Sequence, residues 1–267
     1  MSAFAATVAD SAVITKRNLI KIKRVPDLLV FSTLSPIMFV LLFRYVFGGA
    51  IQVPGGLSYA EFLLPGIFAQ TVVFGSTITG YTLAQDLQQG LIDRFRSLPM
   101  SRSAVLVGRT VADAMSNLIS IAVMAVTGVI VGWRIHTSAL EALGGFLLLI
   151  LFAFSISWLM ALVGLLVRAP EVVNNASFIV IFPLTFISCA FVPLQSLPSV
   201  LRTFAEWNPV STVVQAAREL FGNTLGPPSS TAWSMQHAAL YTVLWAGAFL
   251  AVFVPLSVRA YRRAASR

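Results

Sequence analysis

The chain has 267 residues, of which 57% are hydrophobic and only 10% are charged, and its net charge is +8. Soluble proteins carry about 25% charged residues, so this composition excludes a soluble domain, and the hydrophobicity excludes a disordered chain. Cys189 is the single cysteine, which excludes a disulfide-stabilised scaffold. The composition therefore predicts an integral membrane protein.

An amphipathic helix is predicted near the N-terminus, over residues 5–24. Its apolar positions recur at helical spacing and are Val8, Ala12, Leu19 and Ile22. Its opposite face carries the positive side chains Lys16, Arg17, Lys21, Lys23 and Arg24. We expect this helix to lie flat in the membrane interface with its charges toward anionic lipid, the alternative being a plain positively charged tail.

Six stretches of the chain are long and apolar enough to cross a bilayer. Crossing about 30 Å of hydrocarbon at about 1.5 Å per residue takes roughly 20 residues. The predicted spans are residues 28–47, 62–83, 105–133, 143–167, 172–192 and 235–258. Pro36 is expected to bend the first of them. We therefore expect an all-α, polytopic membrane protein whose six transmembrane helices form a single domain over residues 1–267.

The positions of the Lys and Arg residues predict the orientation in the cell membrane. These residues fall in short patches between the apolar runs, and positive residues are retained on the cytoplasmic side. If both termini lie in the cytoplasm, the six spans place only four of the 18 positive residues on the outer side of the membrane, and these are Arg44, Arg134, Arg202 and Arg218. A nucleic-acid binder instead gathers its positive residues on a solvated face, so no nucleic-acid partner is expected.

A second amphipathic helix is predicted between the second and third spans, from Gln85 to Pro99. Its apolar stripe consists of Leu87, Leu91, Phe95 and Leu98. A cytoplasmic helix with a narrow apolar stripe is suited to dock into the groove of a soluble partner, the alternative being that the stripe packs on the protein's own surface. The residues assigned to this contact are Asp86, Leu87, Gly90, Leu91, Asp93, Arg94, Phe95, Arg96, Leu98 and Pro99.

Polar side chains inside the spans are the next candidates for function. Arg109 and Asp113 lie four residues apart near the inner end of the third span, which predicts a structural ion pair. The candidate substrate pathway consists of Thr71, Ser76, Thr77 and Thr79 on the second span and Asn174, Asn175 and Ser177 on the fifth. The alternative is that these side chains only hold the helices together. An uncharged pathway suits an amphiphilic or lipid-like substrate better than a small ion.

The outer segment, residues 193–234, is too apolar for a solvated loop. Within it, the stretch from Asn208 to Gly222 predicts a short helix that Gly222 ends. We expect a re-entrant helical hairpin that dips into the outer leaflet, with a helical outer cap as the alternative.

Several kinds of chemistry have no support in the sequence. A nucleotide-binding Walker A loop requires a Gly-Lys pair, and none of the three lysines follows a glycine. His136 and His237 are far apart and have no further ligand nearby, so no metal site is predicted. We therefore expect no catalytic residue, no cofactor in this chain and no ATPase site of its own.

Two motifs give the chain a resemblance to a known family. In the stretch "QDLQQGLIDRFRSLPMSRSAVLVGRTVAD" the matching positions are Gly90, Arg94, Leu98, Pro99, Arg102, Gly108 and Arg109. In "NPVSTVVQAAREL" they are Asn208, Pro209 and Arg218. With these motifs the chain resembles the membrane subunit of type-2 ABC exporters, and in particular the daunorubicin/doxorubicin-resistance permeases.

The resemblance implies a cytoplasmic coupling helix at residues 85–99 and outer re-entrant helices before the last span. It also implies an assembly of two permease subunits, as a homodimer or a paralogous heterodimer, with two separate ATP-binding subunits that use ATP and Mg. Many relatives carry glutamates just before the coupling glycine, where this chain has Gln88 and Gln89. A coupling contact that needs a carboxylate at those positions therefore has no support here.

The resulting prediction is a permease subunit, in contact with membrane lipid, that exports a hydrophobic or amphiphilic drug or lipid. Export of a lipid-linked polysaccharide is the first alternative, which aromatic rings near the membrane surface would favour, but the five tryptophans are scattered. A membrane-embedded lipid-modifying enzyme is a lesser alternative and would need a reactive cluster. A passive channel or secondary transporter would work without ATP.

Overall fold

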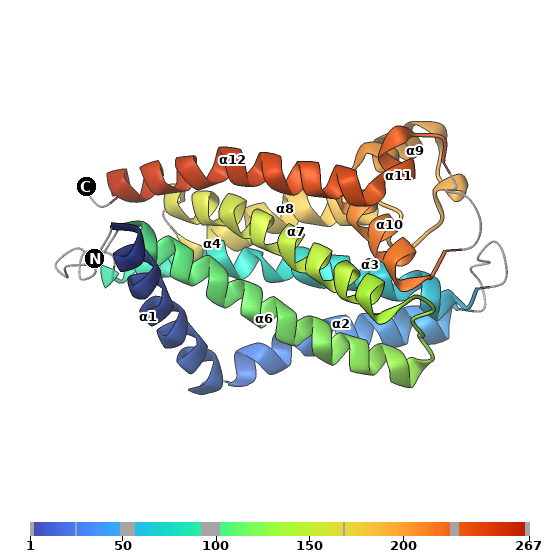
Figure 1. Cartoon of the computed structure of the whole chain (residues 1–267), viewed down its shortest axis with the longest axis horizontal. Coiled ribbons are helices and arrows are strands. Elements are labelled where there is room, and N and C mark those ends of the chain that lie inside the picture. Colours follow the sequence, from blue (N-terminus) through green and yellow to red (C-terminus); the bar gives the residue numbers. More distant parts are fainter. Residues whose placement is uncertain are drawn as a thin grey trace.

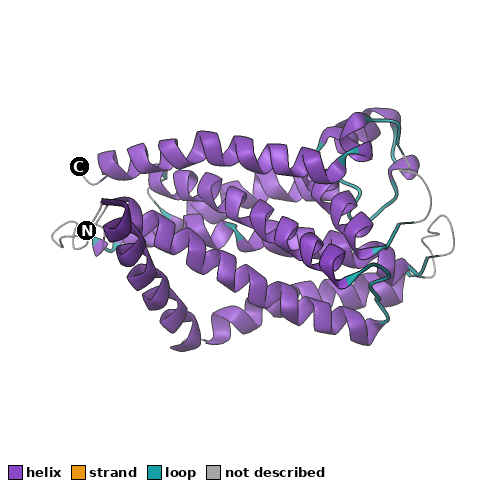
Figure 2. Cartoon of the chain, in the orientation of Figure 1, coloured by secondary structure: helices purple, strands orange, loops and turns teal. Residues whose placement is uncertain are grey.

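The computed structural model describes residues 3–24, 26–48, 57–91, 102–167, 169–224 and 230–264. This part of the chain is helical and contains no strand (Figure 2). Its helices are α1 (Ala3–Arg24), α2 (Pro26–Leu42), the π-helical η1 (Phe43–Phe47), α3 (Tyr59–Gly75), α4 (Thr77–Gln88), α6 (Arg102–Val131), α7 (Ala139–Leu166), α8 (Pro170–Phe186), the 3-10 helix η3 (Leu194–Ser196), α9 (Ser199–Trp207), α10 (Pro209–Phe221), α11 (Trp233–Gln236) and α12 (Ala238–Ala264).

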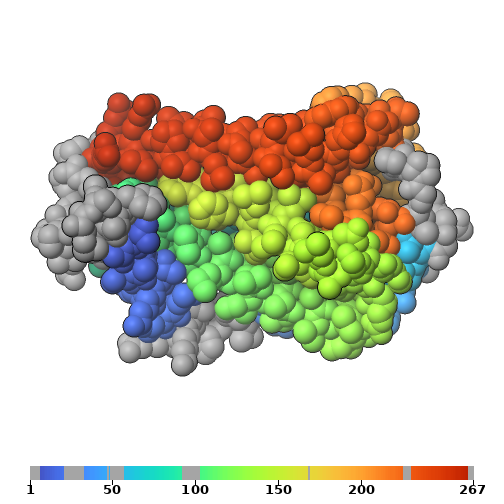
Figure 3. All heavy atoms as spheres, viewed as in Figure 1, coloured from blue at the N-terminus to red at the C-terminus, as the bar shows by residue number. Residues whose placement is uncertain are grey.

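The long helices form an elongated bundle with two different ends (Figure 1). α1 begins and α12 ends at one of them, which we call the terminal end. The short helices α9, α10 and α11 gather at the opposite end. α12 lies along α7 and forms the upper edge of the face in Figure 3, and the Ser257 hydroxyl on α12 donates to the Trp158 carbonyl at 3.0 Å.

Four helical stretches among the described residues are long and apolar enough to cross a membrane. They are Tyr59–Gln88, Ser103–Val131, Ala139–Leu166 and Ala238–Arg263. Two further apolar helices are shorter, Thr33–Val46 and Pro170–Phe186. These lengths indicate a multi-pass membrane protein, while the count of six spans stays a prediction. Pro36 lies inside α2 and does not end it.

The N-terminal segment 5–24 forms α1, which packs on the first turns of α6. Ile14 is 4% exposed and faces Gly108, where an added Cβ would lie 2.7 Å from the Cβ of Ile14. The Thr15 hydroxyl donates to the Gly108 carbonyl at 3.1 Å. α1 is therefore attached to a long apolar helix by one face, and its place at the membrane interface stays a prediction.

The second predicted span, residues 62–83, consists of two helices that meet at Ser76. The Ser76 hydroxyl donates to the Val72 carbonyl within the same helix at 2.7 Å and to the Ala153 carbonyl of α7 at 3.0 Å. A serine that bonds back to the preceding turn bends a helix. The junction between α3 and α4 is thus fixed from outside by α7.

The fifth predicted span, residues 172–192, is shorter than the apolar pattern indicates. α8 ends at Phe186, and the chain continues without regular helix to Pro193. The carbonyls of Leu184, Ile187 and Cys189 accept hydrogen bonds from side chains of α10 or its cap instead of from later turns of α8. Tertiary contacts therefore end this helix although its sequence remains apolar.

The predicted helix from Asn208 to Gly222 is present as α10 and lies inside the bundle. Val210, Val213 and Phe221 on it are fully buried. Gly222 ends it with φ of 71°, a left-handed conformation that glycine adopts without strain. The rings of Phe68 and Trp133 meet Phe221 edge to face, with centroids 6.1 and 5.4 Å away. The main core thus surrounds this short helix.

α4 and α7 cross so closely that their backbones touch, at Gly80 and Gly164. A Cβ on Gly164 would overlap the Gly80 carbonyl. We expect Gly164→Ala to lower the free energy of unfolding by about 1–3 kcal/mol, because an added methyl forces the helices apart. Thermal unfolding of the purified protein in detergent measures this. Gly247→Ala on α12 is the matched control, since no atom lies within 4 Å of its added Cβ, and equal melting temperatures for the two variants would contradict the prediction.

Candidate functional site

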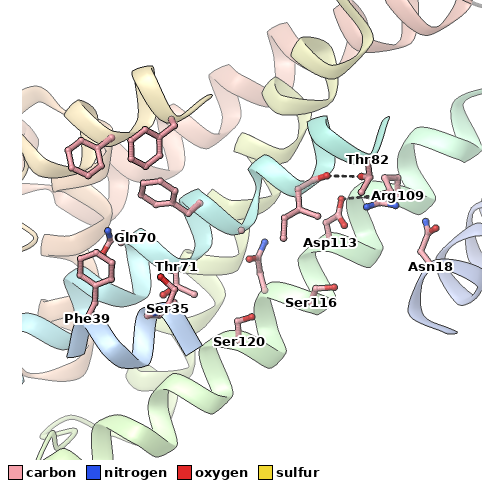
Figure 4. Close-up of a pocket in the computed structure, with 17 residues that line it drawn as sticks. Asn18, Ser35, Phe39, Gln70, Thr71, Thr82, Arg109, Asp113, Ser116 and Ser120 are labelled. Carbon is pink, nitrogen blue, oxygen red and sulfur yellow. Dashed lines mark hydrogen bonds and ion pairs between the residues drawn. The ribbon is translucent and has the colours of Figure 1, made fainter. Parts of the chain in front are cut away.

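A cavity of about 470 Å³ lies in the bundle between α1, α2, α3, α4, α6 and α8 (Figure 4). One part of its wall is aromatic and consists of Phe39, Phe74, Phe178 and Phe182, which we call the phenylalanine wall. Another part is polar and comes from α6. The cavity therefore offers both an apolar surface and hydrogen-bonding groups, as ligand sites commonly do.

The polar part is a row of side chains along one face of α6. Its members are Arg109, Asp113, Ser116, Asn117 and Ser120. Figure 4 shows the labelled ones following one another along the helix. Steps of three and four residues bring side chains to the same face of a helix. Only Arg109 and Asp113 are among the residues predicted from the sequence, although polar residues at this spacing in an apolar span were a signal for the other three.

Arg109 and Asp113 make contact at the terminal-end side of this row. The Nε of Arg109 lies 3.2 Å from Oδ2 of Asp113, and the side chains are 10% and 8% exposed. The Thr79 hydroxyl on α4 donates to the same carboxylate oxygen at 2.6 Å. The pair therefore joins α4 to α6, and its opposite charges compensate each other where desolvation makes an unpaired charge costly.

The predicted pathway residues fall into three groups. Thr71 lines the cavity, and Thr79 contacts the ion pair beside it. The hydroxyls of Ser76, Thr77 and Ser177 donate to backbone carbonyls of the helices. Asn174 and Asn175 are exposed on α8 and are not among the cavity-lining residues. Of the seven predicted residues, Thr71 alone lines the cavity, and Thr79 contacts it only through the ion pair.

The predicted docking residues are only partly within the described chain. Asp86 and Leu87 belong to the last turn of α4, which ends at Gln88. Gly90 has φ of 66°, so the helix expected from Gln85 onward is interrupted there, because a left-handed residue breaks the helical hydrogen-bond pattern. Leu91 follows the break. The residues Asp93, Arg94, Phe95, Arg96, Leu98 and Pro99 lie outside the described residues.

Asn208 connects the start of α10 to the end of α8. Its Nδ2 donates to the carbonyls of Leu184 and Ile187 at 2.7 and 2.8 Å, and its Oδ1 accepts from the Val210 amide at 2.9 Å. The last contact is a helix N-cap, and Pro209 occupies the first position of the helix, where its missing amide costs nothing. One side chain thus caps the N-terminus of α10 and donates to carbonyls at the C-terminal end of α8.

Arg218 is the most enclosed cation among the described residues, with 3% exposure. Its Nε donates to the Phe62 carbonyl at 3.0 Å, and its Nη2 donates to the carbonyls of Cys189 and Ala190 at 2.7 and 3.2 Å. The guanidinium carbon lies 3.7 Å from the centre of the Phe62 ring, within cation–π distance. Arg218 therefore holds α3, α10 and the segment after α8 together.

The ABC-2 type transporter family matches residues 11–221. A daunorubicin resistance ABC transporter permease of Streptomyces coeruleorubidus is 35% identical over 260 residues, which is 97% of this chain and 88% of that protein. The chain belongs to the ABC-2 type transporter family. The matched residues of this ABC-2 transporter include every residue that lines the cavity.

More distant relatives of this ABC-2 transporter are permeases as well. A probable doxorubicin resistance ABC transporter permease of Mycobacterium tuberculosis is 26% identical over 97% of this chain and 90% of its own length. A putative transport permease of Cyanophora paradoxa is 26% identical over 81% of this chain and 76% of its own length. Such proteins are permease subunits, and the family implies an ABC ATPase subunit as partner.

Proposed function

We propose that this chain is the membrane-spanning subunit of an ATP-driven exporter, and that it moves hydrophobic or amphiphilic drugs or lipids out across the cell membrane. The observation that carries the proposal is the likeness, over 97% of the chain, to a daunorubicin resistance permease. The cavity supports the proposal, because its volume of about 470 Å³ falls within the range of binding sites for drug-sized molecules. The same volume is small for a polysaccharide chain.

The working assembly proposed here contains two permease subunits, identical or paralogous, and two ATP-binding subunits that use ATP and Mg. The terminal end of the bundle faces the cytoplasm, with both chain termini. Positive side chains near that end support this orientation, among them Arg259, Arg262 and Arg263 on the last turns of α12. The short helices at the opposite end then enter the outer leaflet as re-entrant elements.

Helix α4 offers a mechanical connection from the partner to the cavity. The docking segment, residues 85–99, begins in the last turn of α4. The same helix carries Ile78 and Thr82, which line the cavity, and Thr79, which bonds Asp113. Closure of the ATP-binding subunits moves the docking segment, and α4 tilts about its junction with α3, which the bond from Ser76 to α7 holds in place. Such a tilt changes the cavity wall directly.

The function is tested by reconstituting the permease with its ATP-binding partner in liposomes. We expect daunorubicin to accumulate in inverted vesicles when ATP is added and not when a non-hydrolysable analogue replaces it. Uptake that persists without ATP but stops when the ion gradient is collapsed would indicate a secondary transporter instead. Turnover of lipid by the permease alone would indicate an enzyme.

The docking segment is tested by replacing Leu91 and Phe95 with aspartate together. We expect copurification with the ATP-binding partner and ATP-dependent export to fall at least about tenfold, because two charges cannot enter an apolar groove. Leu140→Asp, at an 80% exposed leucine at the other end of the bundle, is the matched control and should leave both unchanged. Normal copurification and export by the double variant would show that the assignment is wrong.

A further inference from the structure

The loop between α6 and α7, residues 132–138, is bound to the end of α10. Both lie at the end of the bundle opposite the terminal end (Figure 1). The His136 amide donates to the Phe221 carbonyl at 2.9 Å, and the Thr137 hydroxyl donates to the Leu220 carbonyl at 2.6 Å. These carbonyls belong to the last turn of α10, where a helix has no partners of its own for them. The loop and α10 therefore form one hydrogen-bonded unit.

The imidazole of His136 connects this unit to the start of α3. Its Nε2 lies 2.7 Å from Oε1 of Glu61, in the first turn of that helix. The Glu61 side chain is 12% exposed, whereas that of His136 is 50% exposed. The second carboxylate oxygen, Oε2, accepts from the amide and the hydroxyl of Ser58 at 3.1 and 2.9 Å. The carboxylate is thus fixed by the helix cap, and the histidine reaches it from another element.

The same end of α3 has a second attachment that does not depend on pH. The carbonyl of Phe62, the residue after Glu61, accepts from Nε of Arg218 on α10 at 3.0 Å. Arginine stays charged in proteins, whereas histidine gains or loses its proton between about pH 5 and 8. The attachment of α3 to the loop and α10 is therefore constant at Phe62 and varies with pH at Glu61.

The charged neighbours of His136 in the chain have other partners. Arg134 donates to the carbonyls of Val129 and Trp133, and Glu141 on α7 accepts from Ser138. The remaining ionisable groups at this end of the described chain are Arg44, Tyr45, Tyr59, Arg202, Glu206, Arg218, Glu219, His237 and Tyr241. Among the described residues, Glu61 is the one carboxylate within ion-pair distance of His136. A proton on His136 therefore acts on this contact.

We propose that His136 and Glu61 form a pH-sensitive latch on the outer face of the exporter. Acid closes the latch, because a protonated imidazole makes a charge-assisted hydrogen bond, which is about twice as strong as a neutral one. The stability that this charge contributes is fully present at low pH and is lost as the pH rises and the histidine loses its proton.

The latch has a consequence for transport. Release of a substrate at this end requires α3 to move away from the loop and α10, so an acidic outside slows export. This step rests on the proposed export function and on the orientation proposed with it. The effect of pH on the contact itself requires neither ATP nor the partner subunit.

The first test measures stability in the full-length permease alone, purified in detergent. His136→Gln keeps a side-chain donor that stays neutral at every pH. We expect this variant to melt about 1–4 °C below the wild type at pH 5.5, and the difference to shrink to less than half at pH 8.0. A difference of the same size at both pH values would overturn the proposal.

Two further variants assign the pH response to this contact. Glu61→Gln removes the carboxylate charge and keeps the capping of α3, because glutamine serves in a capping box as glutamate does. It should reduce the response as His136→Gln does. His237→Gln is the matched control, since His237 lies at the same end with its imidazole against the Trp233 ring, and it should keep the wild-type response. A wild-type response in Glu61→Gln, or a response in His237→Gln as small as that in His136→Gln, would contradict the latch.

The transport test sets the pH on the outer face alone. In inverted vesicles with the ATP-binding partner the lumen corresponds to the outside, so the lumen is buffered at pH 5.5 or 8.0 and the medium at pH 7.4. Initial rates of ATP-dependent daunorubicin uptake are compared between His136→Gln and the wild type at the same lumen pH, because an acidic lumen traps an amine equally in both. We expect the variant to be about two- to fivefold faster at pH 5.5 and equal at pH 8.0.

The outcomes for the latch and for the export function are separable. A ratio of the two rates that is the same at both lumen pH values refutes the control of export by the latch and leaves the export function intact. A wild type without ATP-dependent uptake at either pH, together with the pH-dependent melting difference, supports the contact and refutes the exporter.

Discussion

Arg218→Leu is expected to lower the free energy of unfolding by about 3 kcal/mol or more, because it leaves buried carbonyls without donors. The guanidinium donates to the carbonyls of Phe62, Cys189 and Ala190. Each unpaired buried acceptor costs about 1–3 kcal/mol, and leucine supplies apolar volume but no donor. For a chain of this size the melting temperature should fall by about 6–12 °C.

Two further variants separate the loss of donors from the loss of charge. Arg218→Lys keeps the positive charge, but a single ammonium on a flexible stem does not reproduce the planar fork, so an intermediate melting temperature is expected. Arg202→Leu on α9 removes a partly exposed arginine that pairs with Glu206, and it should change little. A wild-type melting temperature for Arg218→Leu would show that the carbonyls find other donors.

The sequence predicts the long helices well, because their lengths follow from apolar runs that lipid requires. It predicts the junctions poorly. Ser76 divides the second apolar run by bonding to the Ala153 carbonyl of α7, and α8 ends at Phe186 where Asn208 takes up its carbonyls. Both interruptions of a helix depend on hydrogen bonds to residues far away in the chain, so no local sequence pattern predicts them.

The candidate site was predictable only where it depends on a local pattern. The polar row on α6 follows from helical spacing alone, and Ser116, Asn117 and Ser120 could have been found by it. The phenylalanine wall could not, because it needs α2, α3 and α8 to be placed around α6. Nor does any sequence pattern show that Asn174 is exposed while Thr71 lines the cavity, since both are polar residues in apolar helices.

Asp113→Leu is expected to lower the free energy of unfolding by about 3–5 kcal/mol, because it leaves Arg109 buried without its carboxylate. The double variant Arg109→Met/Asp113→Leu should recover most of this loss, since replacing both members of a buried pair by apolar groups is often neutral. Melting temperatures of the single and double variants measure the coupling. A double variant as unstable as Asp113→Leu would show that the loss of stability does not come from an unpaired charge.

The same double variant distinguishes a structural pair from one that serves transport. It removes the acceptor for the Thr79 hydroxyl, and with it the side-chain contact that connects α4 to α6 beside the cavity. If α4 carries motion from the docking segment to the cavity, the double variant should fold normally and yet export daunorubicin several-fold more slowly. Thr79→Val breaks that contact and leaves the ion pair in place, so it should slow export without a large change in melting temperature. Wild-type export by both variants would contradict a role in transport and would leave the pair with only its effect on stability.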